Sequence, residues 1–189
     1  MRLIAISGGI GSGKSVVAAM LRAMGHEVYD CDSRAKKIMD SDSAIISRIA
    51  SEVCAEAVVC GSIDRRRLAE VVFSDAHALS RLNSIVHGAV RSDIARWASD
   101  RSLAFVETAI LYQSGIDRMV SEVWQVVAPL SLRLGRAMRR DNASEQAVRA
   151  RIATQDSHIP VRVHPCVREI VNDEVEPLLP QLLSLLHSE

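Results

Sequence analysis

One octapeptide near the start of the chain constrains its fold more than any other stretch. Gly8-Gly9-Ile10-Gly11-Ser12-Gly13-Lys14-Ser15 matches the pattern G-x-x-x-x-G-K-S/T, which marks a phosphate-binding loop between a strand and a helix. The apolar stretch Arg2–Ser7 before it predicts a buried strand. Val16–Met24 after it predicts a helix that ends at Gly25. Both flanking elements are therefore present, and the sequence predicts a nucleotide-phosphate site beyond the first strand.

The residues of this loop have separate expected roles. Glycines let backbone N–H groups turn inward and bind phosphate oxygens, and the helix N-terminus adds positive charge. Lys14 is expected to reach the β- and γ-phosphates, and the Ser15 hydroxyl to bind Mg²⁺. A glycine-rich turn that binds nothing is the alternative, which the flanking elements oppose. The expected nucleotide-binding residues of the loop are Gly9, Ile10, Gly11, Ser12, Gly13, Lys14, Ser15 and Val16.

The composition argues against several classes of function. The 189 residues include 23 basic and 23 acidic side chains, so the formal net charge is zero. This balance gives no electrostatic footprint for nucleic acid or for a membrane surface. No apolar stretch reaches membrane-spanning length. The four cysteines contain no C-x-x-C pair, which argues against a zinc or redox motif, and thiols outside disulfides are typical of the cytoplasm.

Two aspartates follow the second predicted strand, His26–Tyr29. In open parallel sheets, ligands bind beyond the carboxyl ends of the strands. One of the two is expected to cap the helix that runs from Ser33 to Met39, since aspartate is favoured at the N-cap. We assign the cap to Asp30 and the chemical role to Asp32, with the reverse assignment as the alternative.

The stretch from Asp42 to Ala98 has a helical pattern that interrupts the alternation of strands and helices. Asp64 is expected to cap a helix from Arg65 to Phe73, Asp75 to cap the next helix, and Gly88 to break that helix. The stretch is interpreted as an insertion over the acceptor side of a nucleotide site; a helical layer packed on the sheet is the alternative. Arg65, Arg66 and Arg67 either contact an anion or form a solvated face.

An acidic residue ends the third predicted strand. Leu103–Val106 is apolar and Glu107 follows it. A carboxylate at this place is expected to support the Mg²⁺ shell through water. Glu122–Ala128 and Cys166–Val171 predict the fourth and fifth strands, and a last helix is expected from Glu174 to His187.

An arginine-rich segment precedes the last strand. Ser131–Arg140 predicts a helix, and Asn142 with Glu145 predicts a capping box for the next one. Two such helices are interpreted as a lid that brings positive charge to the phosphates and excludes water. A surface hairpin with solvated arginines is the alternative.

These elements predict an α/β fold, with a five-stranded parallel sheet flanked by helices. Residues 1–189 are interpreted as one domain of the phosphate-loop kinase type. The expected core is 1–32, 102–136 and 160–189. A helical substrate-binding region is expected at about 33–101, and the lid at about 137–159.

Several stretches, in this order, resemble the dephospho-CoA kinase family. The phosphate loop is similar to that of the family residue for residue, and Tyr29–Ala35 resembles its aspartate motif. The resemblance spans nearly the whole chain. The later motifs are represented by Ile63–Leu68, Val72, Phe73, Leu82, Asn83, His87, Arg136, Arg140, Asp141, Gln155 and Asn172.

The resemblance implies transfer of the ATP γ-phosphate to the ribose 3′-hydroxyl of dephospho-CoA, the last step of coenzyme A synthesis. It implies Asp32 as the base that accepts the hydroxyl proton, with Lys14 and Arg140 acting on the migrating phosphoryl group. It further implies that Arg136 and Asn172 bind nucleotide. Arg65, His87 and Glu107 are the remaining candidates for substrate contact, His87 bracing the helices in the alternative view.

The chain departs from the family pattern at three positions. Gly88 replaces the usual proline after the substrate-region histidine, and Ala109 and Gln113 replace a frequent proline and glutamate. None of these lies in the phosphate loop. Two other functions are weighed: a kinase for another small acceptor, such as a nucleoside, a nucleotide or shikimate, and a nucleotide-dependent switch without an acceptor.

Overall fold

The computed structural model describes residues 1–157 and 164–187, and the chain forms two compact units. The sheet unit comprises Met1–Tyr29 and Arg101–Glu189, and the helical unit comprises Asp30–Asp100. Positions 158–163 of the predicted lid and core, and positions 188–189, lie outside the described residues.

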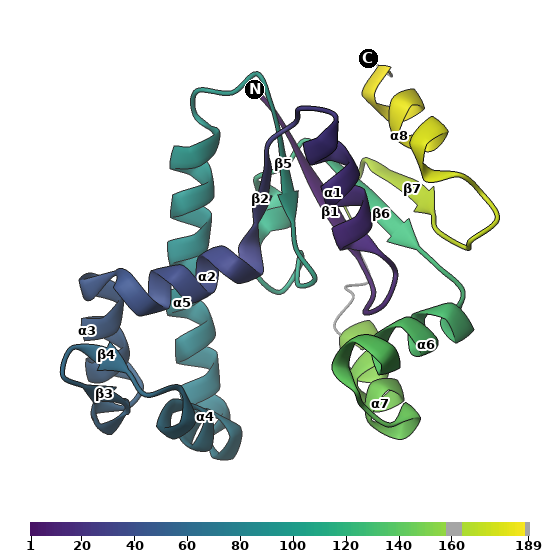
Figure 1. Ribbon diagram of the computed structural model, residues 1–189. Coiled ribbons are helices and arrows are strands. Elements are labelled where there is room, and N and C mark those ends of the chain that lie inside the picture. Colours follow the sequence, from purple (N-terminus) through teal and green to yellow (C-terminus); the bar gives the residue numbers. More distant parts are fainter. Residues whose placement is uncertain (158–163, 188–189) are drawn as a thin grey trace. The chain divides into compact units, whose positions relative to one another are not determined.

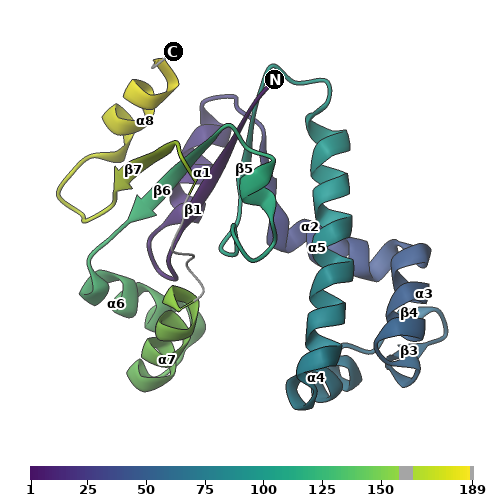
Figure 2. The same cartoon turned by 180° about the vertical axis from the view of Figure 1, so that it is seen from behind.

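The sheet unit is a five-stranded sheet with helices. Its strand order is β2-β5-β1-β6-β7, and the strands lie side by side in Figures 1 and 2. β1 pairs in parallel with β5 and β6, and β6 pairs in parallel with β7. The predicted α/β fold class is thus confirmed. The strands are β1 (Arg2–Gly8), β2 (Val28–Asp30), β5 (Leu103–Glu107), β6 (Glu122–Val127) and β7 (Val167–Val171), and the helices are α1 (Lys14–Ala23), the 3₁₀ helix η2 (Ile116–Arg118), α6 (Leu130–Asp141), α7 (Glu145–Asp156) and α8 (Leu178–His187).

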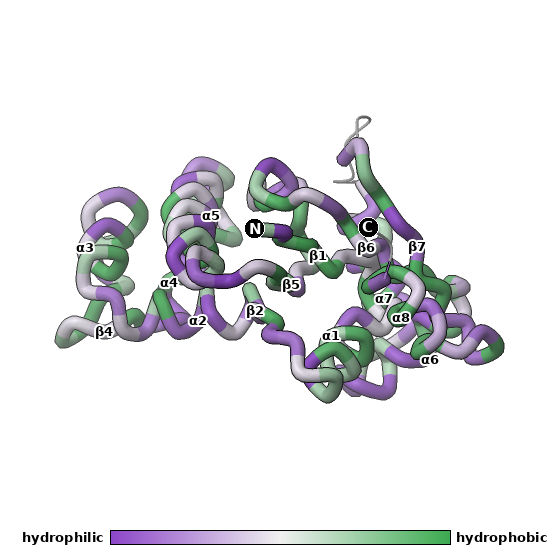
Figure 3. The backbone as a smooth tube through the Cα atoms, turned by 90° about the horizontal axis from the view of Figure 1, so that it is seen from above, coloured by the Kyte–Doolittle hydropathy of each residue, from purple (hydrophilic) through white to green (hydrophobic). Residues whose placement is uncertain are grey.

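Apolar side chains from the strands and from α1 and α8 form the core of this unit. Ile4 and Ile6 alternate along β1 and join Val17 of α1 and Leu182 of α8 in one buried cluster. The phenyl ring of Phe105 lies 5.2 Å from the indole of Trp124 in the same cluster. Figure 3 shows the hydrophobic stretch along β1. Because both neighbours of β1 are strands, its backbone is fixed just before the glycine loop begins.

The helical unit is organised by aspartates that cap its helices. The Asp30 carboxylate accepts from the N–H of Ser33, Asp64 from those of Arg66 and Arg67, and Asp75 from that of His77. These three predicted caps are confirmed. Asp42 caps a further helix. The elements are α2 (Cys31–Ser41), α3 (Ser43–Glu52), the 3₁₀ helix η1 (Ala55–Ala57), β3 (Val58–Val59), β4 (Ser62–Ile63), α4 (Arg65–Ser74) and α5 (Ala76–Ala98).

Several sequence expectations about element bounds are wrong. α5 runs through Gly88 without a break, because buried Ile85, Val90 and Ile94 hold the helix on both sides of it. α1 begins at Lys14 rather than at Val16. α8 begins after Pro177, and Glu174 adopts a positive φ of 71° before it. The antiparallel hairpin of β3 and β4 was not predicted.

The expected capping box at Asn142 is also wrong. Ser144 caps α7, with its hydroxyl accepting from the N–H of Ala147. Asn142 instead ends α6 in the left-handed conformation, with φ 48° and ψ 45°, a geometry that asparagine tolerates better than most residues.

Candidate functional site

The glycine loop between β1 and α1 has the shape of a phosphate cradle. Gly11 and Gly13 have φ angles of 76° and 99°, in the left-handed region. The loop closes on itself through Ser12 N–H, which donates to Gly9 O at 3.1 Å. Lys14 Nζ folds back over the loop and donates to Gly8 O at 2.9 Å and to Gly9 O at 3.2 Å. The lysine ammonium therefore lies at the loop whose N–H groups are expected to bind phosphate.

Asn172, directly after β7, lies against the loop. Its Nδ2 donates to Ser12 O at 2.8 Å. A Cβ at Gly13 would clash with this amide nitrogen, so glycine is required there by close approach as well as by its φ angle. Arg136 of α6 donates through Nη1 to Asn172 O at 3.1 Å. The structure thus brings together Asn172, Arg136 and the loop.

Two residues of the α6–α7 hairpin form hydrogen bonds with the loop at Ile10. Arg133 Nε donates to Ile10 O at 3.0 Å, and Ile10 N–H donates to Gln155 Oε1 at 2.7 Å. Sequence reasoning gave Arg133 no role and placed Gln155 only in a motif. One signal was available for the arginine: Arg133, Arg136 and Arg140 are spaced i, i+3 and i+7, which places them on one helix face.

A cavity of about 310 Å³ lies beside the loop within the sheet unit. Ser12, Tyr112, Gln113 and Arg133 are among the residues that line it. Among residues 1–157 and 164–187, the two buried side-chain polar atoms without a hydrogen-bond partner are Ser12 Oγ and Arg133 Nη2. Arg133 Nη2 lies 3.7 Å from Asp156 Oδ1. Buried polar groups of this kind bind a ligand or ordered water.

Arg140, the candidate catalytic arginine, is held at the end of α6 by its neighbour. Its guanidinium contacts the Asp141 carboxylate with two hydrogen bonds, of 2.7 and 3.1 Å. Arg151 of α7 donates to the same carboxylate at 2.7 Å. Asp141 raises the pKa of Arg140, and Arg140 together with Arg151 holds the pKa of Asp141 well below its usual range. Because 61% of the Arg140 side chain is exposed, the pair is solvent-screened and can separate at low cost.

Ser15 and Glu107 are the candidates for Mg²⁺. Ser15 is exposed in the first turn of α1, and Glu107 ends β5, in register with Ile6 of β1. Hydroxyl and carboxylate oxygens are the donors that Mg²⁺ prefers, with phosphate oxygens and water completing its shell. Within the described part of the chain, no group of three or more His, Cys, Asp or Glu side chains is arranged to hold a metal. One hydroxyl and one carboxylate are donors that fit Mg²⁺ where phosphate oxygens and water supply the rest of its shell.

Asp32, Arg65 and His87 belong to the helical unit. Asp32 is exposed in the first turn of α2, two residues after Asp30, which caps that helix. Arg65 Nη2 contacts Asp40 Oδ1 at 2.7 Å and so links α4 to α2. His87 is half-buried in the middle of α5.

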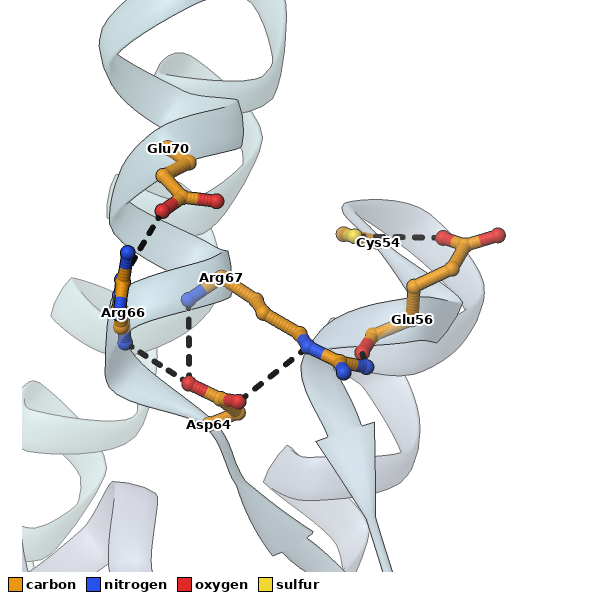
Figure 4. Close-up of polar contacts among 6 residues, drawn as sticks. All are labelled: Cys54, Glu56, Asp64, Arg66, Arg67 and Glu70. Carbon is orange, nitrogen blue, oxygen red and sulfur yellow. Dashed lines mark hydrogen bonds and ion pairs between the residues drawn. The ribbon is translucent and has the colours of Figure 1, made fainter.

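The other two arginines of the Arg65–Arg67 run have partners within the helical unit (Figure 4). Arg66 Nε donates to Glu70 Oε1 at 3.2 Å. Arg67 lies 3.4 Å from Asp64 Oδ2 and donates to Glu56 O at 3.3 Å. Both serve the local structure of α4 and η1 in this arrangement.

No helix among the described residues has the length and apolar character needed to cross a bilayer.

Comparisons with known proteins agree on one family. The family model for dephospho-CoA kinase matches residues 2–173. A dephospho-CoA kinase of Bacteroides fragilis is 38% identical over 189 residues, covering 97% of this chain and 90% of the relative. One of Porphyromonas gingivalis is 34% identical over 190 residues, covering 100% and 94%. A crystal structure of a Thermus thermophilus protein aligns with a TM-score of 0.77 at 34% identity, covering 98% and 96% of the two chains.

The matched residues include the glycine loop, the helical unit, the α6–α7 hairpin and Asn172. The chain belongs to the dephospho-CoA kinase family.

Proposed function

We propose that the chain transfers the γ-phosphate of ATP to the ribose 3′-hydroxyl of dephospho-CoA and releases CoA and ADP. The observation that carries the proposal is the cradle formed by the glycine loop, with Lys14 Nζ folded onto it and Asn172 and Arg136 beside it. This cradle supplies the N–H groups and positive charge that a triphosphate needs. Membership of the dephospho-CoA kinase family supports dephospho-CoA as the proposed acceptor.

The reaction forms one O–P bond and breaks another. The 3′-oxygen bonds to the γ-phosphorus, the bond from that phosphorus to the β–γ bridging oxygen breaks, and the hydroxyl proton goes to a base. Asp32 is the proposed base. Asp30 is occupied with capping α2, whereas the Asp32 carboxylate is exposed in the first turn of that helix. An aspartate at this step orients the hydroxyl and accepts its proton.

Cationic groups of the sheet unit stabilise the charge on the phosphates. Lys14 acts on the β- and γ-oxygens, and Arg136 and Asn172 hold the nucleotide. When the lid closes, the Arg140 guanidinium leaves the Asp141 carboxylate and contacts the migrating phosphoryl group. An arginine in this role contributes several powers of ten in rate in related enzymes. The exposed Arg140–Asp141 pair is weak enough for such an exchange.

Mg²⁺ is proposed to bind at Ser15, with Glu107 supporting it through water. When bound, the ion neutralises charge on the β- and γ-phosphates. Arg65 and His87 are proposed to bind the acceptor. To reach an acceptor phosphate, Arg65 has to leave Asp40, with which it pairs in this structure. A cytoplasmic location is also proposed, since the cysteine thiols fit a reducing compartment.

The test is a coupled assay of ADP release with ATP, Mg²⁺ and dephospho-CoA, with mass spectrometry of the product. We expect ADP release that depends on dephospho-CoA and a product heavier by one phosphoryl group at the 3′ position. Nucleoside monophosphates, nucleosides and shikimate serve as competing acceptors. Phosphorylation of one of these, with dephospho-CoA inert, would overturn the proposal. Slow ATP hydrolysis without any phosphorylated acceptor would indicate a switch.

A further inference from the structure

Ile10, in the middle of the glycine loop, contacts the α6–α7 hairpin through its N–H, its carbonyl and its side chain. Its N–H donates to Gln155 Oε1 at 2.7 Å, and its carbonyl accepts from Arg133 Nε at 3.0 Å. Its side chain packs on the apolar cluster between the two helices, which contains Leu134 and Val148. One loop residue is therefore fixed through donor, acceptor and side chain by two helices that follow it by more than 100 positions.

Gln155 uses both ends of its amide for this attachment. The oxygen accepts from Ile10, and the nitrogen donates to Ala109 O at 2.9 Å. Ala109 lies two residues after the end of β5. The pattern fixes which amide atom is which, because only the oxygen accepts and only the nitrogen donates. A single side chain of α7 thus joins the loop after β1 to the loop after β5.

The hydrogen bonds to Ile10 act on a part of the loop whose own backbone is flexible. Ile10 lies between Gly9 and Gly11, and Gly11 has a φ of 76°. Glycine loses more conformational freedom on ordering than any other residue. A loop that is ordered before the ligand arrives pays less of this entropy on binding. A contact that orders Ile10 before the ligand arrives can therefore reduce the conformational entropy that the loop loses when it binds phosphate.

We propose that Gln155 is a positioning residue that holds the phosphate loop in its binding shape through the Ile10 N–H and the Ala109 carbonyl. The inference rests on the nucleotide-binding half of the proposed function and is independent of which acceptor is used. Arg133 acts with it from α6 on the Ile10 carbonyl. Neither side chain has to touch the reacting atoms for this role.

The first test measures the Ile10 amide directly. Amide hydrogen exchange by NMR on the ligand-free full chain is compared for Gln155→Ala, Gln155→Glu and Gln146→Ala. Gln146 is an exposed glutamine of the same helix and gives a matched control. We expect exchange at Ile10 to be about three- to tenfold faster in Q155A, from the loss of one partly buried hydrogen bond. Q155E keeps an acceptor for Ile10 but loses the donor to Ala109 O, so its exchange is expected to lie between those of the wild type and Q155A.

The second test measures binding of a non-hydrolysable ATP analogue, adenylyl imidodiphosphate, with Mg²⁺ by calorimetry. Q155A is expected to bind it about five- to tenfold more weakly than Q146A, at temperatures where both are folded by circular dichroism. Equal affinities would overturn the proposal, whatever the exchange rates show. Tighter binding by Q155A would overturn it as well, because Gln155 would then compete with the phosphate. If Q155A binds the analogue more weakly but its Ile10 amide exchanges at the wild-type rate, Gln155 does not act through the Ile10 amide and the proposal is overturned as well.

Neither readout needs turnover or an acceptor. A chain that passes both tests and fails to phosphorylate dephospho-CoA would overturn the proposed reaction and leave this role of Gln155 in place.

Discussion

Asn172 joins three pieces of chain that are far apart in sequence. Its N–H donates to the carbonyl of Val127 at the end of β6, its side-chain amide donates to Ser12 O, and its carbonyl accepts from Arg136. The amide and Ser12 are 160 residues apart. Arg136 Nη2 also lies 3.5 Å from Asn172 Oδ1. The asparagine side chain, which has both a donor and an acceptor, therefore contacts the glycine loop and the arginine at once. This explains why asparagine, rather than a charged residue, suits the end of β7.

Changing Asp32 to Asn tests the proposed base at the scale of one residue. Asparagine keeps the size of the side chain and removes the group that accepts a proton. We expect the turnover number with dephospho-CoA to fall by about two to four powers of ten, with little change in the KM for ATP. Steady-state kinetics at saturating ATP measure this.

Asp42→Asn is the matched control for that substitution. Asp42 caps α3, and asparagine caps about as well as aspartate. Its turnover should stay close to that of the wild type. Turnover of D32N within about threefold of D42N would remove Asp32 from the role of base.

At the scale of the element, Glu122 connects three neighbouring strands. Its carboxylate accepts from Arg2 of β1 at 2.8 Å and from the Trp124 indole of β6 at 3.0 Å, and it lies 3.3 Å from Arg168 of β7. Burial disfavours the charged form of Glu122, but these partners together lower its pKa below the ordinary value. The carboxylate is therefore ionised where it ties β1, β6 and β7 together.

Changing Glu122 to Gln should destabilise the fold in a pH-dependent way. A group whose pKa is lower in the folded state stabilises the fold above its unfolded pKa of about 4.3, and this stabilisation is lost as the pH falls through the folded pKa. We expect E122Q to lower the free energy of unfolding by about 1–3 kcal/mol at pH 7, with a smaller difference at pH 3. Urea unfolding at both values measures it.

Glu70→Gln is the control, since Glu70 forms an exposed pair with Arg66. Exposed pairs on one helix contribute about 0.3–0.5 kcal/mol. A loss for E122Q no larger than that for E70Q at pH 7 would contradict the role of Glu122.

Gly88 lies in the interior of α5, and Gly25 follows the end of α1 with a φ of 90°. A Cβ at Gly88 would meet only Arg91 Nη2, at 3.9 Å, and one at Gly25 would meet nothing within 4 Å. The two sites differ in backbone conformation and not in available space. We expect Gly88→Ala to raise the free energy of unfolding by about 0.5–1 kcal/mol and Gly25→Ala to lower it by about 1–2 kcal/mol. Thermal or urea unfolding of both variants checks the opposite signs.

Local signals determined the elements that were predicted correctly. The capping aspartates Asp30, Asp64 and Asp75 act on N–H groups two or three residues ahead, so their pattern is visible in the sequence. At the turn before α7, Asn142 and Ser144 are both good caps, and the sequence does not rank them. The β3–β4 hairpin has strands of two residues each, which is too short for an alternating pattern.

At the scale of the whole molecule, nucleotide binding should stabilise the fold. A ligand at 100 times its dissociation constant adds about 2.7 kcal/mol. For a chain of this length, that corresponds to a rise in the melting temperature of about 5–10 °C. We expect this shift with ATP and Mg²⁺ and a smaller one when EDTA removes the metal ion. Differential scanning fluorimetry measures both.

Lys14→Ala is the control for this stabilisation. The variant removes the ammonium that folds over the loop and should lose most of the shift, while its circular dichroism spectrum stays that of the wild type. A full shift in K14A would mean that the nucleotide binds elsewhere.

Contacts between distant segments were the part that the sequence did not predict. The glycine loop, the parallel α/β fold class and the arginine-rich helices follow from short patterns. The contact of Ile10 with Gln155 spans 145 residues, and no local pattern encodes such a pairing. The same holds for Asn172 with Ser12. Short patterns therefore indicated the candidate residues of the phosphate site, whereas the contacts among these residues were not predicted.

The central position of β1 in the sheet has a consequence for folding during translation. β1 pairs with β5 and β6, and β5 begins at Leu103. At about 5–20 residues per second, a ribosome needs on the order of 5–20 s to make the intervening chain. During this time neither β5 nor β6 is available to β1, so the backbone groups and apolar side chains of this strand stay open to contact with other chains. Chaperone contact with this segment early in translation is the natural protection against aggregation.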